Sequence, residues 1–305
     1  MDSLALLEPK KSLENSSIGP VDLHVNLWKN GKNCFLDIGI KIKEYKHDSG
    51  VIFLYVKDLQ CEDVEDLSPK LTEATLLNAI FNENYRPTPA IERYTDVQSA
   101  EKSEDKFTIC PIVKKLDDKS QCLEISWTSN QSTKEEAKNL YLRFRIKGDF
   151  INGLSQKEHL SRLQELAYTV DTIDIRINQR RNLTKTPLMN DNTKQFLKFK
   201  SINCFVIRSI KDQYTVSSRT LKSVRKLESL WAEKYIEKEF CDKTFAYQLQ
   251  HRREGEPLDD FGMTMQFKIL RGVKFWLLGY FTLMLINYFF TKVLDCFISL
   301  FTTSG

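Results

Sequence analysis

The chain contains 305 residues, of which 28% are charged and 41% are hydrophobic, and its formal net charge is +4. This composition is typical of a globular protein with one or two domains, and it excludes a chain that is disordered throughout. The seven cysteines lie far apart without a C-x-x-C pair, which favours reduced thiols over a disulfide framework. The N-terminus has no basic segment followed by an apolar one, so no signal peptide is expected.

Residues 1–150 predict a cytosolic, antiparallel β-rich domain. Residues 21–27, 35–44 and 51–56 predict a meander of three strands, because apolar and polar side chains alternate and Asn30-Gly31 favours a tight hairpin turn. Ser68-Pro69 predicts the start of a helix, with Ser as its cap and Pro in its first turn. The periodless residues 84–106 predict a loop, and further strands are expected over residues 107–113, 122–128 and 140–147.

Residues 151–254 predict a region of long helices. Behind a capping-box pattern at Ser155–Glu158, apolar residues recur at three-to-four spacing, which predicts one helix over residues 156–182. A second long helix is expected over residues 217–253. Residues 196–210 fit both a helix and a strand, and the helix is favoured.

The C-terminal segment predicts a membrane span. Residues 275–290 carry no charge, but sixteen helical residues span only about 24 Å, short of a hydrocarbon core of roughly 30 Å. The predicted transmembrane helix therefore extends over residues 275–301, behind a juxtamembrane linker over residues 255–274. Basic residues before the run place the body in the cytosol by the positive-inside rule. The expected location is the bacterial inner membrane, crossed once.

A polar stripe follows one side of this predicted helix. Its members recur at every fourth position, and they are Asn287, Thr291, Asp295 and Ser299. Gly279 permits close approach of a neighbouring helix. The stripe predicts helix packing or a pore, which requires a homo-oligomer. The alternative is that the residues from Thr291 onward lie at the far headgroups, with Lys292 and Asp295 exposed.

The sequence offers no convincing catalytic constellation, and neither a cofactor nor a metal site is expected. The chain lacks phosphate-loop, dinucleotide and nucleophile-elbow motifs as well as paired metal-ligand spacings. A divalent-metal nuclease site near Asp117 and Glu124 is a minor alternative, because acidic residues near a lysine are common by chance. Asp171 and Asp174 are better explained as part of a polar helix face next to Arg176 and Arg180 than as a paired-carboxylate site.

Residues 176–226 carry the clearest charge signal. They contain thirteen lysines and arginines against only Asp191 and Asp212. Cations at the start of the second predicted helix oppose its dipole, which suggests that an external anion such as a phosphate offsets the cost. The residues predicted to bind this anion are Arg176, Arg180, Arg181, Lys185, Arg219, Lys222, Arg225 and Lys226. The same charges are also compatible with a solvated basic face or with attraction to anionic lipid.

The predicted class is therefore α+β: a β-rich domain, a long-helix region with a basic surface, and one C-terminal transmembrane helix. This order of parts, with the basic segment over residues 176–226, resembles the membrane effectors of bacterial anti-phage systems, particularly the HalA effectors of Hailong systems. The resemblance implies an oligomeric effector that binds a nucleotide or short nucleic acid made by a partner nucleotidyltransferase and controls a transmembrane pore. The alternative is a non-enzymatic, tail-anchored scaffold or interaction protein.

Overall fold

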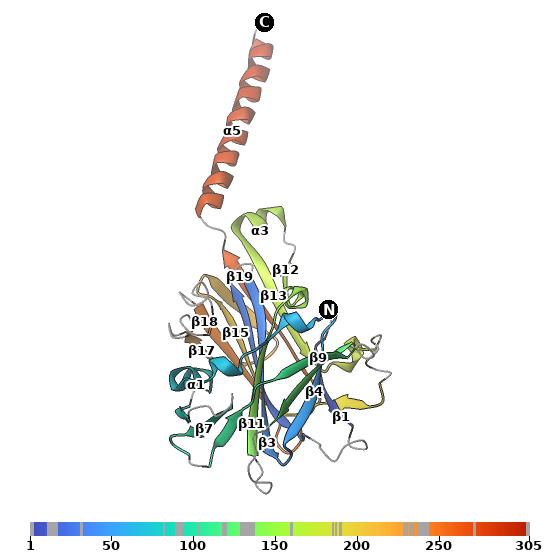
Figure 1. The fold of residues 1–305 in the computed structure, drawn as a ribbon. Coiled ribbons are helices and arrows are strands. Elements are labelled where there is room, and N and C mark those ends of the chain that lie inside the picture. Colours follow the sequence, from blue (N-terminus) through green and yellow to red (C-terminus); the bar gives the residue numbers. More distant parts are fainter. Residues whose placement is uncertain are drawn as a thin grey trace. The chain divides into compact units, whose positions relative to one another are not determined.

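A computed structural model describes residues 3–302 except for 11–17, 31–32, 82, 89–93, 103, 118–120, 129–137, 159–160, 185, 187, 189–190, 228–230, 232–234, 237–243 and 271–272. The chain forms two compact units. Unit 1 contains Met1–Gln156, Ile173–Ile210 and Ser217–Met265, and unit 2 contains Lys157–Thr172, Lys211–Val216 and Gln266–Gly305. Strands dominate the described part of the chain (Figure 1).

The largest sheet of unit 1 has ten strands. The strand order is β17-β18-β15-β2-β3-β11-β8-β7-β6, with β5 paired to β11. The strands are β2 (Val21–Asn30), β3 (Asn33–Tyr45), β5 (Val64–Asp66), β6 (Tyr85–Pro87), β7 (Thr95–Ser99), β8 (Lys106–Ile109), β11 (Lys138–Ile146), β15 (Phe199–Ser209), β17 (Leu221–Lys226) and β18 (Thr244–Arg252). β2 pairs antiparallel with β3 and parallel with β15, so residues far apart in sequence meet in adjacent strands.

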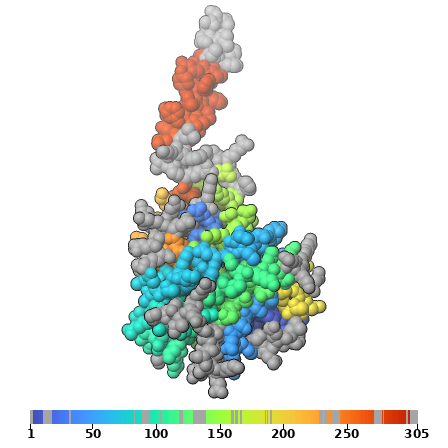
Figure 2. Space-filling view, viewed as in Figure 1, coloured from blue at the N-terminus to red at the C-terminus, as the bar shows by residue number. Residues whose placement is uncertain are grey.

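Two smaller sheets complete the strand arrangement. The five-stranded sheet has the order β14-β1-β4-β10-β9, and the four-stranded sheet has the order β12-β13-β19-β16. Their strands are β1 (Ala5–Pro9), β4 (Ser49–Tyr55), β9 (Val113–Asp117), β10 (Cys122–Thr128), β14 (Lys194–Phe196), β12 (Ser155–Glu158), β13 (Tyr168–Ile177), β16 (Asp212–Ser217) and β19 (Phe261–Leu270). The cyan-to-green part of the chain forms much of the visible face of unit 1 (Figure 2).

Helices are few among the described residues. They are α1 (Ala74–Phe81), α2 (Asp149–Gly153), α3 (Arg162–Ala167) and α5 (Val273–Thr302), together with the 3-10 turns η1 (Cys61–Asp63), η2 (Ser68–Lys70) and η3 (Arg180–Asn182). Helix α1 buries Leu76, Leu77 and Ile80 in a core cluster that also contains Trp28 and Tyr141. Complete burial of such a side chain stabilises the fold by about 1.5–3 kcal/mol.

Several predicted strands are confirmed, but the meander is wrong. β2 and β3 form the expected antiparallel pair around residues 31–32, which lie outside the described residues. β4 joins a different sheet, where it pairs with β1 and β10. The expected strands over residues 122–128 and 140–147 are β10 and β11. Residues 84–106 were expected to form a loop, but they contain β6 and β7 and the start of β8.

The prediction of an α+β protein with a long-helix region is wrong. Residues 156–182 contain β12, the short helix α3 and β13, and residues 196–210 are largely β15. The described part of residues 217–253 forms β17 and β18. Ile173, Ile175 and Ile177 are buried at every second position of β13. This period of two, from β-branched residues that favour strands, outweighs the weaker three-to-four spacing.

The predicted transmembrane helix over residues 275–301 is also wrong. Within the residues that the structure describes, no helix is long and apolar enough to cross a membrane. The physical reason lies in the sequence: the uncharged run covers only about 24 Å as a helix, and Lys292 and Asp295 then interrupt it. The expected single-pass location in the bacterial inner membrane, with a cytosolic body, is overturned by the same finding.

Unit 2 combines the described ends of several strands with α3 and α5. Gln266 donates a hydrogen bond of 3.2 Å to the hydroxyl of Thr172, and the ammonium of Lys268 lies 3.8 Å from the ring centre of Tyr168. Tyr214 and Phe267 meet edge to face. Helix α5 exposes large apolar side chains, among them Phe281, Phe289 and Phe290.

Candidate functional site

A cleft of about 480 Å³ in unit 1 is the principal candidate site. It is lined by Glu8, Gly19, Pro20, Arg180, Gln195, Phe196, Lys198 and Asp259. This volume lies within the range of small-molecule sites in proteins. The cleft brings together residues from five separate parts of the sequence, so its composition follows from the fold.

Pairing of β1 with β14 builds one wall of the cleft. The two strands are antiparallel, with Glu8 opposite Gln195 and Leu7 opposite Phe196. Gln195 donates a 3.0 Å hydrogen bond to Oε1 of Glu8, whose Oε2 accepts one of 3.0 Å from the backbone of Ile18. Both oxygens of the buried Glu8 are therefore engaged by the protein, and the carboxylate serves mainly to hold this wall together.

Asn178 positions Arg180 at the mouth of the cleft. Asn178 is buried and has a φ of 57°, a left-handed conformation that Asn tolerates better than most residues. Its Oδ1 accepts a 2.8 Å hydrogen bond from the backbone of Leu6, and its Nδ2 donates one of 2.9 Å to the carbonyl of Leu197. These contacts fix the turn between β13 and η3, and Arg180 is the first residue of η3.

Two exposed cations face the cleft. The guanidinium of Arg180 lies 5.4 Å from the ring centre of Phe196, and Phe196 in turn packs against the core cluster of Leu7 and Tyr55. Among the described residues, none accepts a hydrogen bond from this guanidinium. Lys198 lies 3.7 Å from Asp259, but both side chains are more than half exposed. Such an ion pair contributes little stability and is easily exchanged for another partner.

The chemistry of the cleft is that of anion binding. Arg180 offers a planar set of donors supported by an aromatic ring, and Lys198 adds a second positive charge. A third side chain, Phe196, provides an apolar surface next to these charges. A phosphate or carboxylate attached to a planar group matches this combination.

Three other residues of the predicted anion site are engaged elsewhere in unit 1. Arg176 is held by Asp174 through two hydrogen bonds of 2.6 and 3.1 Å. Arg219 donates to the carbonyl of Gly262 at 2.7 Å and lies over the ring of Phe261. Arg225 donates to the carbonyl of Ala79 at 2.8 Å. These three arginines therefore have structural roles in unit 1.

The remaining predicted residues have simpler environments. Arg181 is exposed in η3 beside Arg180, while Lys222 and Lys226 are exposed on the edge strand β17. Lys185 lies outside the described residues. On α5, Asn287, Thr291 and Asp295 are exposed and Gly279 is half-buried, whereas the side chain of Ser299 is not described. The pore role of this stripe depended on a membrane span, which the structure contradicts.

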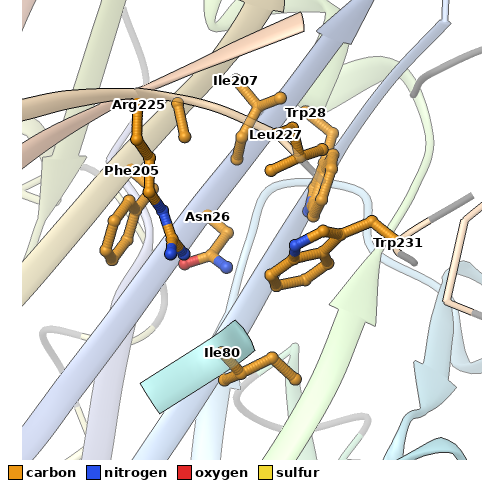
Figure 3. A pocket seen from close by; sticks show the side chains of 9 residues that line it. Asn26, Trp28, Ile80, Phe205, Ile207, Arg225, Leu227 and Trp231 are labelled. Atoms are coloured by element: carbon orange, nitrogen blue, oxygen red, sulfur yellow. The ribbon is translucent and has the colours of Figure 1, made fainter. Parts of the chain in front are cut away.

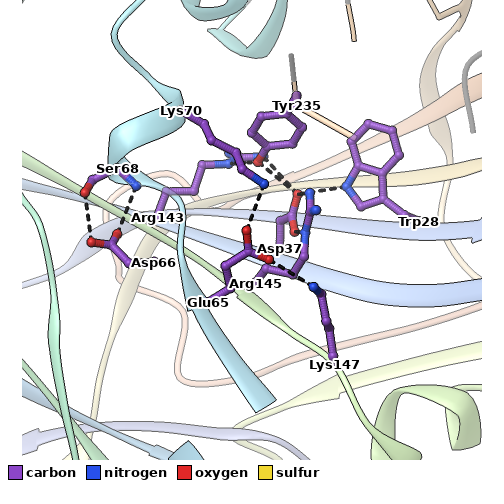
Figure 4. Close-up of polar contacts among 10 residues, drawn as sticks. All are labelled: Trp28, Asp37, Glu65, Asp66, Ser68, Lys70, Arg143, Arg145, Lys147 and Tyr235. Atoms are coloured by element: carbon purple, nitrogen blue, oxygen red, sulfur yellow. Dashed lines mark hydrogen bonds and ion pairs between the residues drawn. The ribbon is translucent and has the colours of Figure 1, made fainter. Parts of the chain in front are cut away.

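A buried polar network lies at the centre of the ten-stranded sheet. Asp37 is fully buried and accepts hydrogen bonds from Trp28 at 2.9 Å and from Arg145 at 2.7 and 3.1 Å (Figure 4). Nε of Arg143 donates a hydrogen bond of 2.5 Å to the hydroxyl of Tyr235. Because a buried charge is tolerated only with such partners, the network constrains the fold strongly.

The electrostatics of the network keep its aromatic and imidazole groups neutral. Burial raises the pKa of Tyr235, and the carboxylate of Asp37 adds to this shift. Burial, together with the nearby cation of Arg143, lowers the pKa of His24 to about 3. Nδ1 of His24 lies 3.2 Å from the hydroxyl of Tyr141. His24 is therefore neutral at physiological pH.

The described residues do not group into a metal centre. Within the described part of the chain, no set of three or more His, Cys, Asp or Glu side chains is placed to hold a metal ion. Asp117, a residue of the nuclease alternative, pairs with Lys194 at 3.0 Å. Glu124 lies opposite Lys115 in the β10–β9 pair.

Of the residues that line the cleft, only Arg180 is among those predicted from the sequence to bind an anion. Glu8, Gln195 and Phe196 come together through the pairing of β1 with β14, which join sequence positions almost 190 residues apart. The hydrogen bonds between Phe199 and Leu258 bring Asp259 to Lys198. Only the charge density of residues 176–226 signalled this site in advance. Comparison of the chain with protein-family models and with curated protein sequences gave no match.

Proposed function

We propose that this β-rich protein is a non-enzymatic binding protein for an anionic ligand of nucleotide size. The cleft lined by Arg180, Lys198 and Phe196 is the proposed site. Arg180 and Lys198 receive the anionic group, most simply a phosphate, and the ring of Phe196 contacts a planar part of the ligand.

The guanidinium of Arg180 is the observation that carries this proposal. It lies over Phe196 at the mouth of the cleft, exposed and without a hydrogen-bond acceptor among the described residues. The arginines of the same segment that serve the fold are engaged differently: Arg176 and Arg219 each donate to a defined oxygen. An exposed guanidinium that no described residue engages by a hydrogen bond is suited to an external oxyanion.

Lys198 provides a second cation for the phosphate of the proposed ligand. Lys198 and Asp259 are paired only loosely, so a phosphate can displace the carboxylate from the ammonium. Gln195 supplies an amide that is able to contact the edge of a base. The resemblance to HalA effectors is consistent with a nucleotide or short nucleic acid as ligand and with a nucleotidyltransferase as its source, and both stay predictions. The transmembrane pore is not retained.

Isothermal titration calorimetry tests this proposal with mononucleotides, short oligonucleotides and inorganic phosphate. The variants are Arg180→Gln and Lys198→Gln, with Arg181→Gln as the matched control, because Arg181 is exposed and adjacent but does not line the cleft. Loss of a charge-assisted contact weakens binding by about 1.5–3 kcal/mol, or roughly tenfold or more. The two cleft variants should show this loss, and the control should bind like the wild type.

Three outcomes contradict the proposal. The first is an absence of saturable binding to every nucleotide of the panel. The second is equal weakening by Arg181→Gln and Arg180→Gln, which indicates a diffuse basic surface. The third is unchanged affinity in both cleft variants, because the ligand then binds elsewhere. A fall of affinity with increasing salt is expected in the wild type and should be shallower in Arg180→Gln.

A further inference from the structure

The four-stranded sheet ends in an exposed strand. β16 is the last strand in the order β12-β13-β19-β16, and within the described part of the chain it pairs with β19 alone. Four consecutive residues of β16, from Gln213 to Val216, are exposed. Successive side chains of a strand point to opposite faces of a sheet, so β16 is exposed on both faces. A further strand is able to pair with the backbone groups at such an edge.

The other sheet edges formed by the described residues carry the features that prevent such pairing. Natural edge strands are protected by charged side chains, by proline or by short length. β6, β12 and β14 have only three or four residues, and each contains a lysine or an arginine. β9 and β17 are longer, and they contain two and three basic residues, respectively.

β16 lacks this protection. Its residues from Gln213 to Ser217 include neither a charged side chain nor a proline. Tyr214, Thr215 and Val216 instead belong to the residue types that favour strands. Tyr214 and Val216 point to the same face of the strand, and they are 38% and 50% exposed. An exposed edge of this composition is suited to pairing with a strand of another chain.

A second copy of β16 fits this edge in one antiparallel register. In a two-fold arrangement centred on Thr215, Tyr214 lies opposite Val216 of the second copy, and Val216 lies opposite its Tyr214. Pairs of an aromatic and a β-branched residue are favourable across antiparallel strands. A register centred on Tyr214 places Val216 opposite Asp212, and one centred on Val216 places Tyr214 opposite Ser218. The register centred on Thr215 is therefore the one that pairs both apolar side chains.

The unit that contains β16 offers further apolar surface to a second copy. Unit 2 also contains Leu270, at the end of β19, and helix α5. Leu270 is 52% exposed, and α5 exposes large apolar side chains from Leu277 to Ile298, a length of about 30 Å. A stable interface buries roughly 1,200–2,000 Å² in total, more than one short strand provides. The exposed apolar side chains of unit 2 are available to extend an interface that begins at β16.

From this edge we propose that β16 is a homodimer interface, at which the strand pairs antiparallel with β16 of a second copy of this chain. The paired strands join the two four-stranded sheets into one continuous sheet. The interface is independent of the nucleotide cleft, because none of the residues that line the cleft belongs to β16.

Sedimentation velocity of the full-length protein tests the proposal with a charge on the edge. Val216→Lys introduces on β16 the kind of side chain that the other edges already carry, and it places that charge opposite Tyr214 of the second copy. The dissociation constant of the dimer should rise about tenfold, because two cross-strand pairs are lost and two charges are introduced. Circular dichroism should show that the variant unfolds like the wild type, since Val216 is half exposed.

Val224→Lys is the matched control. Val224 is 49% exposed on the edge strand β17, which already contains lysines, so the same substitution there should leave the dimer unchanged. Arg225, the next residue, lines a cavity on one face of the ten-stranded sheet (Figure 3). Val224 therefore points to the opposite face, and its replacement leaves that cavity intact.

Hydrogen–deuterium exchange locates the interface on the chain. Backbone amides within residues 213–217 should exchange more slowly at protein concentrations at which the dimer forms than in dilute protein. This dependence on concentration should disappear in Val216→Lys and remain in Val224→Lys.

Three results overturn the proposal. The first is a wild type that stays monomeric over the accessible concentration range. The second is exchange of the β16 amides at the same rate in the monomer and the dimer, because the copies then meet elsewhere. The third is equal weakening of the dimer by Val216→Lys and Val224→Lys. Failure of the nucleotide titrations leaves these experiments unaffected, because they use different residues and no ligand.

Discussion

The hydroxyl of Tyr235 donates a hydrogen bond of 2.9 Å to Oδ2 of Asp37, a residue 198 positions earlier in the chain. Tyr235 lies between β17 and β18, whereas Asp37 lies at the centre of β3. Trp231 of the same connection packs edge to face on Tyr235 at 5.3 Å. This single connection therefore places the indole of Trp231 next to the buried charge network.

Asp37→Asn should be strongly destabilising. The change removes the negative charge opposite Arg145 and the buried Arg143, and loss of one partner of a buried ion pair typically costs about 3–5 kcal/mol. Urea denaturation followed by circular dichroism measures the loss. Glu62→Gln, at an exposed position, is the control and should change the free energy of unfolding by less than about 0.5 kcal/mol. Similar values for both variants contradict a structural role of the network.

Tyr235→Phe tests the same network by the removal of a single oxygen. The hydroxyl accepts from Arg143 and donates to Asp37, so two buried partners lose a hydrogen bond. We expect a loss of about 1–3 kcal/mol in the free energy of unfolding. Tyr94→Phe removes an exposed hydroxyl that contacts Thr128 and should cost much less. Equal stability of the Tyr235→Phe protein and the wild type is the contrary result.

Residue patterns in the sequence predicted individual strands better than they predicted how the strands pair. Alternation of apolar and polar residues identified β2 and β3, although residues 25–28 and 35–42 are buried on both faces of these strands. It did not identify the partners of β4, since pairing across sheets depends on contacts distant in sequence. The helix predicted over residues 156–182 failed because apolar spacings of three and four also occur by chance in a strand. Ile173, Ile175 and Ile177 already carried the alternative period.

The candidate site shows the same division. The basic segment directed attention to Arg180, but charge alone does not distinguish it from Arg176, which Asp174 neutralises two residues away. The donor of Trp231, without an acceptor among the described residues, has no sequence signature, because the residue type does not show whether a buried indole has a hydrogen-bond partner. Whether Arg180 and Trp231 have hydrogen-bond partners depends on which residues lie near them in the fold, and the residue type alone does not show this.

The lowered pKa of His24 predicts that the free energy of unfolding decreases in acid. Its pKa is lowered to about 3 in the folded protein, against about 6.5 when unfolded, so the unfolded chain binds the extra proton between these values. The contribution of neutral His24 is complete above about pH 6.5 and falls as the pH decreases towards about 3, by up to roughly 5 kcal/mol for a pKa change of this size. His24→Gln should flatten this dependence in urea titrations at several pH values. An unchanged slope contradicts the assignment.

The exposed apolar side chains of helix α5 allow a test of the expected homo-oligomer. Phe281 and Phe289 are 65% and 68% exposed, and burial of such side chains against a second copy of the helix is favourable. Lys292 and Asp295 offer opposite charges for pairing between copies. Sedimentation velocity should show association of the wild type, and replacement of both phenylalanines by glutamate should weaken it at least tenfold. A wild type that stays monomeric over the accessible concentration range excludes the homo-oligomer.

Asn178→Ala should lower both the stability of the protein and its affinity for a nucleotide. Asn178 holds the turn before Arg180 through Leu6 and Leu197, and alanine both loses these hydrogen bonds and disfavours a φ of 57°. We expect a loss of about 2–4 kcal/mol in the free energy of unfolding, as two buried backbone groups lose their partners. In protein that remains folded, nucleotide affinity should fall because Arg180 is no longer fixed over Phe196. Asn182→Ala, whose side chain makes only a 3.4 Å contact with Gln179, is the control and should retain both properties. Normal affinity in Asn178→Ala would show that the turn does not position the ligand-binding guanidinium.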